Sequence, residues 1–334
     1  MNERYETPAY GGPGWSPRED SHREEIGRIW SACGVAAEWH PLRTVLLHRP
    51  GAEIEGLADP LAVQMLAQPD PARARAQHDR LAETFRAAGV TVRLVEPAGA
   101  VPPNLMFVAD LLFMTPEGAI LGRPASSVRA GEERLVAWRL AELGVPVLRA
   151  IRGGGTFEGA DAMWLDPDTV LLATGRRTNA AGAAQVAAML AELGVAVIRT
   201  PLPFRSMHLM GLLRIVDGDL AVGWPGAVPP AAAAALRARN IDLLEPPPGP
   251  ELDDGRALNF VTLGPRRILM PDGNPATRVF LERAGIECLT TEVNELAKAA
   301  GAIGCLTGIL ERQQPELPRG GPESWPAAGN RAGR

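Results

Sequence analysis

The chain has 334 residues, of which 46% are apolar and 22% are charged, and its formal net charge is −5 at pH 7. This length allows one large domain or two. The composition is typical of a soluble globular protein, and the slight acidic excess argues against nucleic-acid binding. No apolar run is long enough to span a bilayer, and the first twenty residues lack the apolar core of a secretory signal.

The three cysteines, Cys33, Cys288 and Cys305, are widely spaced and form no CxxC pair. An odd number of separated cysteines argues against a disulfide framework, so we expect a reducing compartment and a cytoplasmic location. The histidines, cysteines and acidic residues show no metal-ligand spacing, so we expect no metal site.

One pattern recurs five times at a period of roughly 45–55 residues: a β-rich run, a turn, a helix and a second β-rich run. The predicted helices are 70–89, 131–144, 182–194, 230–240 and 274–285. Asp70 is a predicted N-cap with Pro71 at the first helical position, and Gly89 ends the helix. Asn274 is a second predicted cap. In the helix over 182–194, Val186 and Leu190 share one face with Leu193, as expected for a helix packed on a sheet.

Five like modules predict a closed α/β ring, because closure removes exposed sheet edges. The alternative is an open, doubly wound sheet. The last four modules carry an additional β-rich run before the turn, as at 110–115 and 161–166. We expect residues 1–36 to form an N-terminal extension, residues 37–312 a single domain, and residues 313–334 a disordered Pro/Gly-rich tail.

The stretch GGGTFEGADA (153–162) combines three glycines with Glu158 and Asp161. A phosphate-binding loop would lead into a helix and usually supply a lysine, whereas this stretch runs into a predicted strand hairpin. The two carboxylates suit a cationic, hydrogen-bond-donating ligand better. The alternative is a bulge whose acids face water.

The histidines differ in their surroundings. His22 and His78 lie in charged stretches and are expected to face solvent, whereas His40 and His48 flank the first strand and are expected to be structural. His208 lies in the apolar, strand-like stretch FRSMHLMGLL, where it is either a satisfied core residue or a catalyst.

Cys305 lies in the apolar, glycine-punctuated stretch AAGAIGCLTGIL. Most such cysteines are buried and inert. A single cysteine with a distant histidine and acids is also the set required for a thiolate nucleophile. Cys33 and Cys288 lack such a setting and are interpreted as structural.

Five motifs occur in one order: NLMFVAD (104–110), FEGAD (157–161), GRRTN (175–179), MHL (207–209) and GCLTG (304–308). In this order they resemble the guanidine-modifying superfamily of arginine deiminases, amidinotransferases and dimethylarginine dimethylaminohydrolases. The resemblance covers roughly residues 40–310, and two further stretches, RRTNAAGAAQ and ILMPDGNPATR, resemble bacterial dimethylarginine dimethylaminohydrolase. It implies the pentein fold, a five-bladed α/β propeller built of five strand-turn-helix-strand modules.

The resemblance also implies site residues. The catalytic set is Cys305 as nucleophile, His208 as general acid and base, and Glu158 as an acid that grips the guanidinium. The binding set is Asp110 for the guanidinium, Arg129 and Arg177 for a substrate carboxylate, and Asp161, whose role is expected to be structural. The implied activity is hydrolysis of a guanidino C–N bond through a covalent thiouronium-type intermediate, giving a ureido product such as citrulline.

Three residues depart from the superfamily patterns. Met210 stands where deiminases and amidinotransferases have an aspartate, and Asn104 and Ala109 stand where dimethylaminohydrolases carry acids. The substrate is therefore left open among guanidino compounds.

Amidino transfer to an amine is the alternative activity. A third hypothesis is a non-catalytic binding protein, such as translation initiation factor six, which has the same fold. We expect a small-molecule partner, no cofactor, and no nucleic-acid or membrane partner, with a homodimer as the assembly to test.

Overall fold

The computed structural model describes residues 6–204, 206–254 and 256–314. Its strands form five three-stranded sheets. In each sheet the central strand pairs antiparallel with one neighbour and parallel with the strand that follows the module's helix, as β4 does with β3 and β5. A parallel pair needs a crossover, which is why every module contains a helix.

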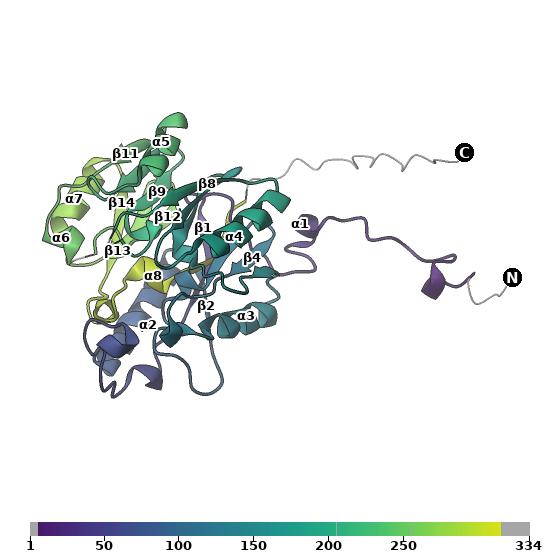
Figure 1. The fold of residues 1–334 in the computed structure, drawn as a ribbon, viewed down its shortest axis with the longest axis horizontal. Coiled ribbons are helices and arrows are strands. Elements are labelled where there is room, and N and C mark those ends of the chain that lie inside the picture. Colours follow the sequence, from purple (N-terminus) through teal and green to yellow (C-terminus); the bar gives the residue numbers. More distant parts are fainter. Residues whose placement is uncertain (1–5, 205, 255, 315–334) are drawn as a thin grey trace.

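The elements follow the predicted repeat (Figure 1). The first module consists of β1 (Leu42–Leu47), α2 (Pro71–Ala87) and β2 (Thr91–Leu94). The second and third consist of β3 (Leu112–Thr115), β4 (Gly118–Leu121), α3 (Glu132–Glu142) and β5 (Val147–Ala150), then β6 (Ala162–Asp166), β7 (Thr169–Thr174), α4 (Ala180–Glu192) and β8 (Ala196–Pro201). The fourth and fifth consist of β9 (Leu213–Asp217), β10 (Leu220–Gly223), α5 (Pro230–Ala238) and β11 (Asp242–Leu244), then, after α6 (Pro250–Asp253), β12 (Val261–Gly264), β13 (Arg267–Pro271), α7 (Pro275–Arg283) and β14 (Glu287–Thr291).

The first sheet is completed from the other end of the chain. After α8 (Ile303–Leu306), strand β15 (Gly308–Arg312) runs antiparallel to β1, with Ile309 opposite Val45 and Gly308 opposite Leu46. This strand supplies the additional run that the first module lacks in the sequence. The pairing closes the ring, so the predicted five-bladed α/β propeller is confirmed and the open doubly wound sheet is wrong.

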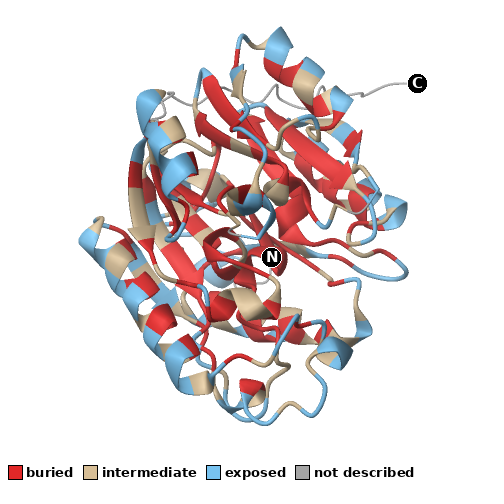
Figure 2. Cartoon of the chain, turned by 90° about the vertical axis from the view of Figure 1, so that its left-hand side faces the viewer, coloured by how far each residue is buried: buried red, intermediate tan, exposed pale blue. Residues whose placement is uncertain are grey.

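The core is divided among the junctions between modules. Buried strands lie inside and the outer helix faces are exposed (Figure 2). One apolar cluster joins the second and third modules, and others join the first with the fifth, the third with the fourth, and the fourth with the fifth. Because each cluster needs side chains from two modules, burial of apolar surface holds neighbouring modules together.

The predicted ends of α2 are confirmed. The Asp70 side chain accepts a hydrogen bond from the Arg73 N–H, Pro71 is the first helical residue, and Gly89 has a φ of +85° just beyond the helix. The left-handed conformation favours glycine at this position.

The predicted N-cap position of α7 is confirmed, but the Asn274 side chain does not cap the helix. Asn274 occupies the N-cap position, but its side chain donates to the carbonyl of Pro271. The Glu251 carboxylate on α6 accepts hydrogen bonds from the backbone N–H groups of Ala276 and Thr277 instead. The acceptor for the first helical turn therefore comes from another helix.

The prediction that His22 and His78 face solvent is also wrong. His22 is half-buried, and its Nε2 lies 3.0 Å from the carbonyl oxygen of Glu117. His78 is fully buried on the inner face of α2, in line with Leu81 and Phe85, and burial lowers its pKa to about 4. Its charged sequence neighbours lie on the other face of the helix, because the helical period separates adjacent residues.

The N-terminal segment extends away from the ring up to α1 (His22–Glu25) (Figure 1). Beyond α1 the chain returns to the propeller, where the Ser31 N–H donates to the Gly144 carbonyl and Gly34 bridges to Glu311. The predicted tail lies outside the described residues from 315 onward. Within the described ranges, no helix combines the length and apolarity needed to cross a membrane.

Candidate active site

Equivalent positions in the five modules carry the polar residues that gather at one end of the ring. Each lies a few residues before the first strand of its sheet: Asp110 in the 3-10 turn η5 (Val108–Asp110), Glu158 before η7 (Gly159–Asp161), His208 before η8 (Leu209–Gly211), Asn259 before β12, and Cys305 in α8 before β15. The repeat therefore brings together residues that are far apart in the sequence. His208 lies at the N-cap of a 3-10 turn, and the strand-like reading of its segment is wrong because β9 begins only at Leu213.

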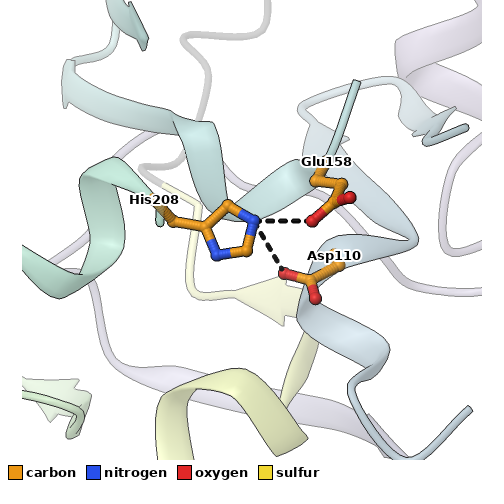
Figure 3. A group of neighbouring side chains, drawn as sticks. All are labelled: Asp110, Glu158 and His208. Atoms are coloured by element: carbon orange, nitrogen blue, oxygen red, sulfur yellow. Dashed lines mark hydrogen bonds and ion pairs between the residues drawn. The ribbon is translucent and has the colours of Figure 1, made fainter. Parts of the chain in front are cut away.

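Asp110, Glu158 and His208 form a buried cluster (Figure 3). The Nε2 atom of His208 lies 2.6 Å from Glu158 Oε2 and 3.7 Å from Asp110 Oδ1. The other carboxylate oxygen of Glu158 accepts from the Ala125 N–H at 3.1 Å. Glu158 is fully buried, so the alternative of acids facing water is wrong.

The cluster is strongly polarised. Burial, the largest single effect, would lower the pKa of His208, but the surrounding carboxylates together outweigh it and raise this pKa to about 10. Burial likewise opposes ionisation of Glu158, but the hydrogen bond and charge of His208, with two nearby arginines, lower the pKa of Glu158 to about 2. An imidazolium–carboxylate pair at neutral pH follows from these shifts.

Glycine at position 159 allows the turns η5 and η7 to touch. A Cβ atom there would lie 2.1 Å from the carbonyl oxygen of Leu112 and 2.5 Å from that of Ala109. These contacts are far below van der Waals distance and involve backbone atoms that cannot swing away. Gly159 therefore sets the approach of Asp110 to Glu158.

The GRRTN motif supports the carboxylates. Thr178 donates to Asp161 Oδ2 at 2.7 Å and accepts from the backbone N–H of Glu158 at 3.3 Å. Asp161 also accepts from the backbone N–H of Leu209, so its carboxylate links the third module to the fourth. Arg177 Nη1 lies 3.5 Å from Glu158 Oε1, and burial raises the pKa of Asp161 to about 6.

Arg129 lies behind Asp110. Its Nη1 donates to Asp110 Oδ2 at 2.5 Å, its Nε and Nη2 donate to Glu132, and Nη2 also approaches the Phe107 carbonyl. All three guanidinium nitrogens thus have protein acceptors. The role expected for Arg129, binding a substrate carboxylate, remains a prediction, and in this arrangement Arg129 serves as the buried counter-charge of Asp110.

Cys305 is held by Asn259, a residue that the sequence did not single out. The Asn259 Nδ2 donates to the Cys305 Sγ at 3.0 Å, and the Asn259 Oδ1 accepts from the Cys305 N–H at 3.1 Å. Asn259 could have been found by applying the repeat to the fifth module, where it occupies the position equivalent to Asp110.

Arg214, the charged residue in the apolar run LLRIV of β9, lies beneath this segment. Its Nη2 is buried, has no hydrogen-bond partner among the described residues, and occupies the space where a Cβ on Gly304 would be. Burial lowers the pKa of Arg214 to about 10, and the strongest opposing influence is the charge of Cys305. The lone arginine in an apolar strand was a signal that the sequence reading missed.

Most of the predicted residues meet in one small cavity, which we call the polar cavity. Its lining includes Asp110, Arg129, Arg177, His208 and Cys305. Glu158 contacts His208 and Arg177 from behind, and Asp161 lies deeper. Asp110 Oδ1 is buried and makes no hydrogen bond within the described part of the chain.

The ligand atoms of Asp110, Glu158 and His208 all lie within 4.8 Å of one another, a spacing that a metal ion could also use. Arg129 Nη1, 3.9 Å from Glu158 and 2.5 Å from Asp110, already places a cation between these two carboxylates. The expectation that the site needs no metal remains a prediction.

Comparisons with known proteins agree with this geometry. A family model described as N,N dimethylarginine dimethylhydrolase, eukaryotic, matches residues 64–228, which include Asp110, Glu158 and His208 but not Cys305. The N(G),N(G)-dimethylarginine dimethylaminohydrolase of Streptomyces coelicolor is 28% identical over 268 residues, covering 80% of this chain and 96% of that protein. The Pseudomonas aeruginosa enzyme is 26% identical over 254 residues, covering 75% and 94%.

A solved structure supports the fold. It is a cysteine-to-serine mutant of the Pseudomonas aeruginosa enzyme complexed with citrulline, and it aligns with a TM-score of 0.68 at 24% identity. The alignment covers 82% of this chain and all of that one.

We predict that Gly159→Ala destabilises the protein and impairs the site, because the added methyl collides with two backbone carbonyls. Overpacking of this kind costs about 1–3 kcal/mol. Gly154→Ala is the matched control, since a Cβ there meets nothing within 4 Å. Chemical denaturation compares the two variants, and equal stability of both would contradict the proposed close approach.

We predict that the His208 imidazole stays protonated well above neutral pH. Because its pKa is raised from 6.5 to about 10, its contribution to the free energy of unfolding is complete below pH 6.5 and is lost as the pH rises through about 10. NMR titration of the labelled ring measures the midpoint. Glu158→Gln should lower that midpoint by about one unit or more. A wild-type midpoint near 6.5 would refute the prediction.

Proposed function

The chain belongs to the guanidine-modifying superfamily, and from that premise we propose that it is a cysteine-dependent hydrolase that cleaves a C–N bond of a guanidino substrate. One observation carries the proposal. Asp110 Oδ1, a buried acceptor without a hydrogen-bond partner among the described residues, lines the same cavity as Cys305 and His208. Asp110 Oδ1 lacks a donor within hydrogen-bond distance among those residues, and a substrate guanidinium supplies one.

The carboxylates of Glu158 and Asp110 have different roles in this proposal. Glu158 already accepts from His208 and Ala125, so its main task in this proposal is to hold the imidazolium in place. Asp110 accepts the substrate guanidinium through its open oxygen, with its other oxygen fixed by Arg129. This assignment gives Glu158 an orienting role and Asp110 the direct contact with substrate.

The chemistry follows from these positions. A guanidinium carbon is stabilised by delocalisation, so it requires a strong nucleophile such as the Cys305 thiolate. The sulfur bonds to the carbon, the imidazolium of His208 gives its proton to the departing nitrogen, and the C–N bond breaks to leave a thiouronium adduct and a free amine. Neutral His208 then takes a proton from water, and the resulting hydroxide displaces the sulfur to give the ureido product.

Asn259 and Arg214 support the nucleophile in this scheme. The Asn259 amide fixes the sulfur by a direct hydrogen bond, and the Arg214 guanidinium places positive charge beneath the adjoining backbone at Gly304. Neither residue would contact the substrate carbon.

Dimethylarginine and arginine are the first substrates to consider, because the similar proteins are named for them. Amidino transfer would form the same adduct, and an amine in place of water would then take the amidino group from the sulfur. Met210 offers no carboxylate, which weakens that alternative. A homodimer and a cytoplasmic location also remain predictions.

We predict that purified protein converts at least one guanidine in a panel to its ureido product without an added amine acceptor. The panel holds arginine, methylated arginines, agmatine, guanidinobutyrate and guanidinoacetate, each with and without glycine, and mass spectrometry identifies the products. Cys305→Ser should abolish turnover, because a hydroxyl is a far poorer nucleophile. Cys288→Ser is the control, since that thiol is buried in the core cluster of the fourth and fifth modules. A product formed only with glycine would instead establish transfer.

We predict that Arg177→Ala raises KM for substrates with a carboxylate by about tenfold or more, since a hydrogen bond to a charged group contributes about 1.5–3 kcal/mol. Agmatine, which has no carboxylate, should be much less affected. Arg152→Ala, on the exposed glycine loop, is the control. Equal effects of Arg177→Ala on both substrate types would rule out carboxylate binding by Arg177.

A further inference from the structure

A second, larger cavity meets the polar cavity at Cys305 and His208. We call it the apolar cavity, and its volume is about 410 Å³ against about 30 Å³ for the polar cavity. Even the polar cavity is large enough for a water-sized group, and the apolar cavity is many times larger. The apolar cavity is therefore the larger of the two spaces open to a ligand part beside the Cys305 sulfur.

The walls of this cavity differ in chemistry from those of the polar cavity. Leu212, Leu252 and Leu258 line it with buried side chains, and Trp224 adds an aromatic surface. Among the described residues, Asp110, Arg129 and Arg177 line only the polar cavity. Apolar walls with few polar groups favour an apolar ligand part.

Large apolar side chains are exposed where the cavity reaches the surface. Phe204 is 80% exposed and Met207 is 46% exposed, and both line the apolar cavity. Two charged residues of opposite sign, Asp253 and Arg256, also line it. The charges of these two residues offset each other, and the His208 imidazolium is paired with Glu158 behind the lining. Among its described lining residues, the cavity therefore has no unpaired charge that would require a charged ligand.

We propose that the apolar cavity receives a bulky apolar substituent on the nitrogen that leaves, so that the preferred substrate is a guanidine with an N-alkyl or N-arylalkyl group larger than methyl. This inference rests on the proposed function, in which Asp110 holds one side of the guanidinium and His208 protonates the nitrogen on the other side. The boundary between the cavities at Cys305 and His208 is where the C–N bond breaks. The substituent then departs as its own primary amine.

Gly211 offers a way to fill the cavity without touching the catalytic residues. It lines the apolar cavity, and a Cβ added there meets no atom within 4 Å. A leucine at this position should point into open space. Gly154→Leu is the matched control, because Gly154 is equally open and lies outside the lining of both cavities.

The experiment compares Nω-methylarginine with Nω-benzylarginine in the full-length protein. We expect kcat/KM for the benzyl compound to be at least tenfold higher, with benzylamine and citrulline as products. Gly211→Leu should reduce the benzyl-to-methyl ratio of kcat/KM at least tenfold, and Gly154→Leu should leave it unchanged. Benzylcitrulline with ammonia as products, or a benzyl compound no better than the methyl one, would overturn the inference while the hydrolase assignment stands.

Ligand binding to the Cys305→Ser protein tests the apolar cavity without depending on turnover. Calorimetry should show at least tenfold tighter binding of the benzyl compound than of the methyl compound, and Gly211→Leu in the same background should remove this preference. If no guanidine is turned over but this preference is found, the proposed function fails and the apolar site stands. Equal affinities would overturn the apolar site itself.

Discussion

The buried ion pair between His208 and Glu158 is the interaction on which the site depends. Its two partners come from different modules and have almost no contact with solvent, so the cost of removing two charges from water must be offset by close geometry and further hydrogen bonds. The Ala125 N–H donates such a bond to the Glu158 carboxylate, and Thr178 holds the Glu158 backbone by accepting from its N–H. The position of the imidazolium is therefore fixed by the packing of neighbouring modules, and the rest of the site is arranged around it.

Features that depend on local sequence were predictable. Asp70 and Gly89 bound α2 as expected, because caps act within a few residues of the helix ends. Val186 and Leu190 are buried on one face of α4, as the helical period requires. The burial of His78 and the acceptor that satisfies the first turn of α7 were not predicted correctly. The charges beside His78 hid its place on the inner face, and Glu251 reaches α7 from another helix.

The site was predictable in part, and the reasons differ by residue. The motifs led to Cys305, His208, Glu158 and Asp110, which the fold places together. Asn259 and Arg214 were missed although each left a signal, the repeat position of Asn259 and the lone charge of Arg214 in an apolar strand. Their contacts with the segment of Cys305 span different modules, so the signals alone do not give their partner. The family resemblance assigns Arg129 to a substrate carboxylate. In the structure its guanidinium instead forms an ion pair with Glu132, one turn further along.

Closure of the ring by β15 ties the position of the Cys305 sulfur to the order in which the chain is made. Cys305 lies directly before β15, and β15 completes a sheet that begins with β1. Until residues 308–312 have been synthesised, the first sheet lacks its outer strand and the thiol has no fixed place beside the carboxylates. A growing chain therefore carries the acids and the histidine for most of its synthesis without Cys305 in place beside them. The site is assembled by the same pairing that completes the fold.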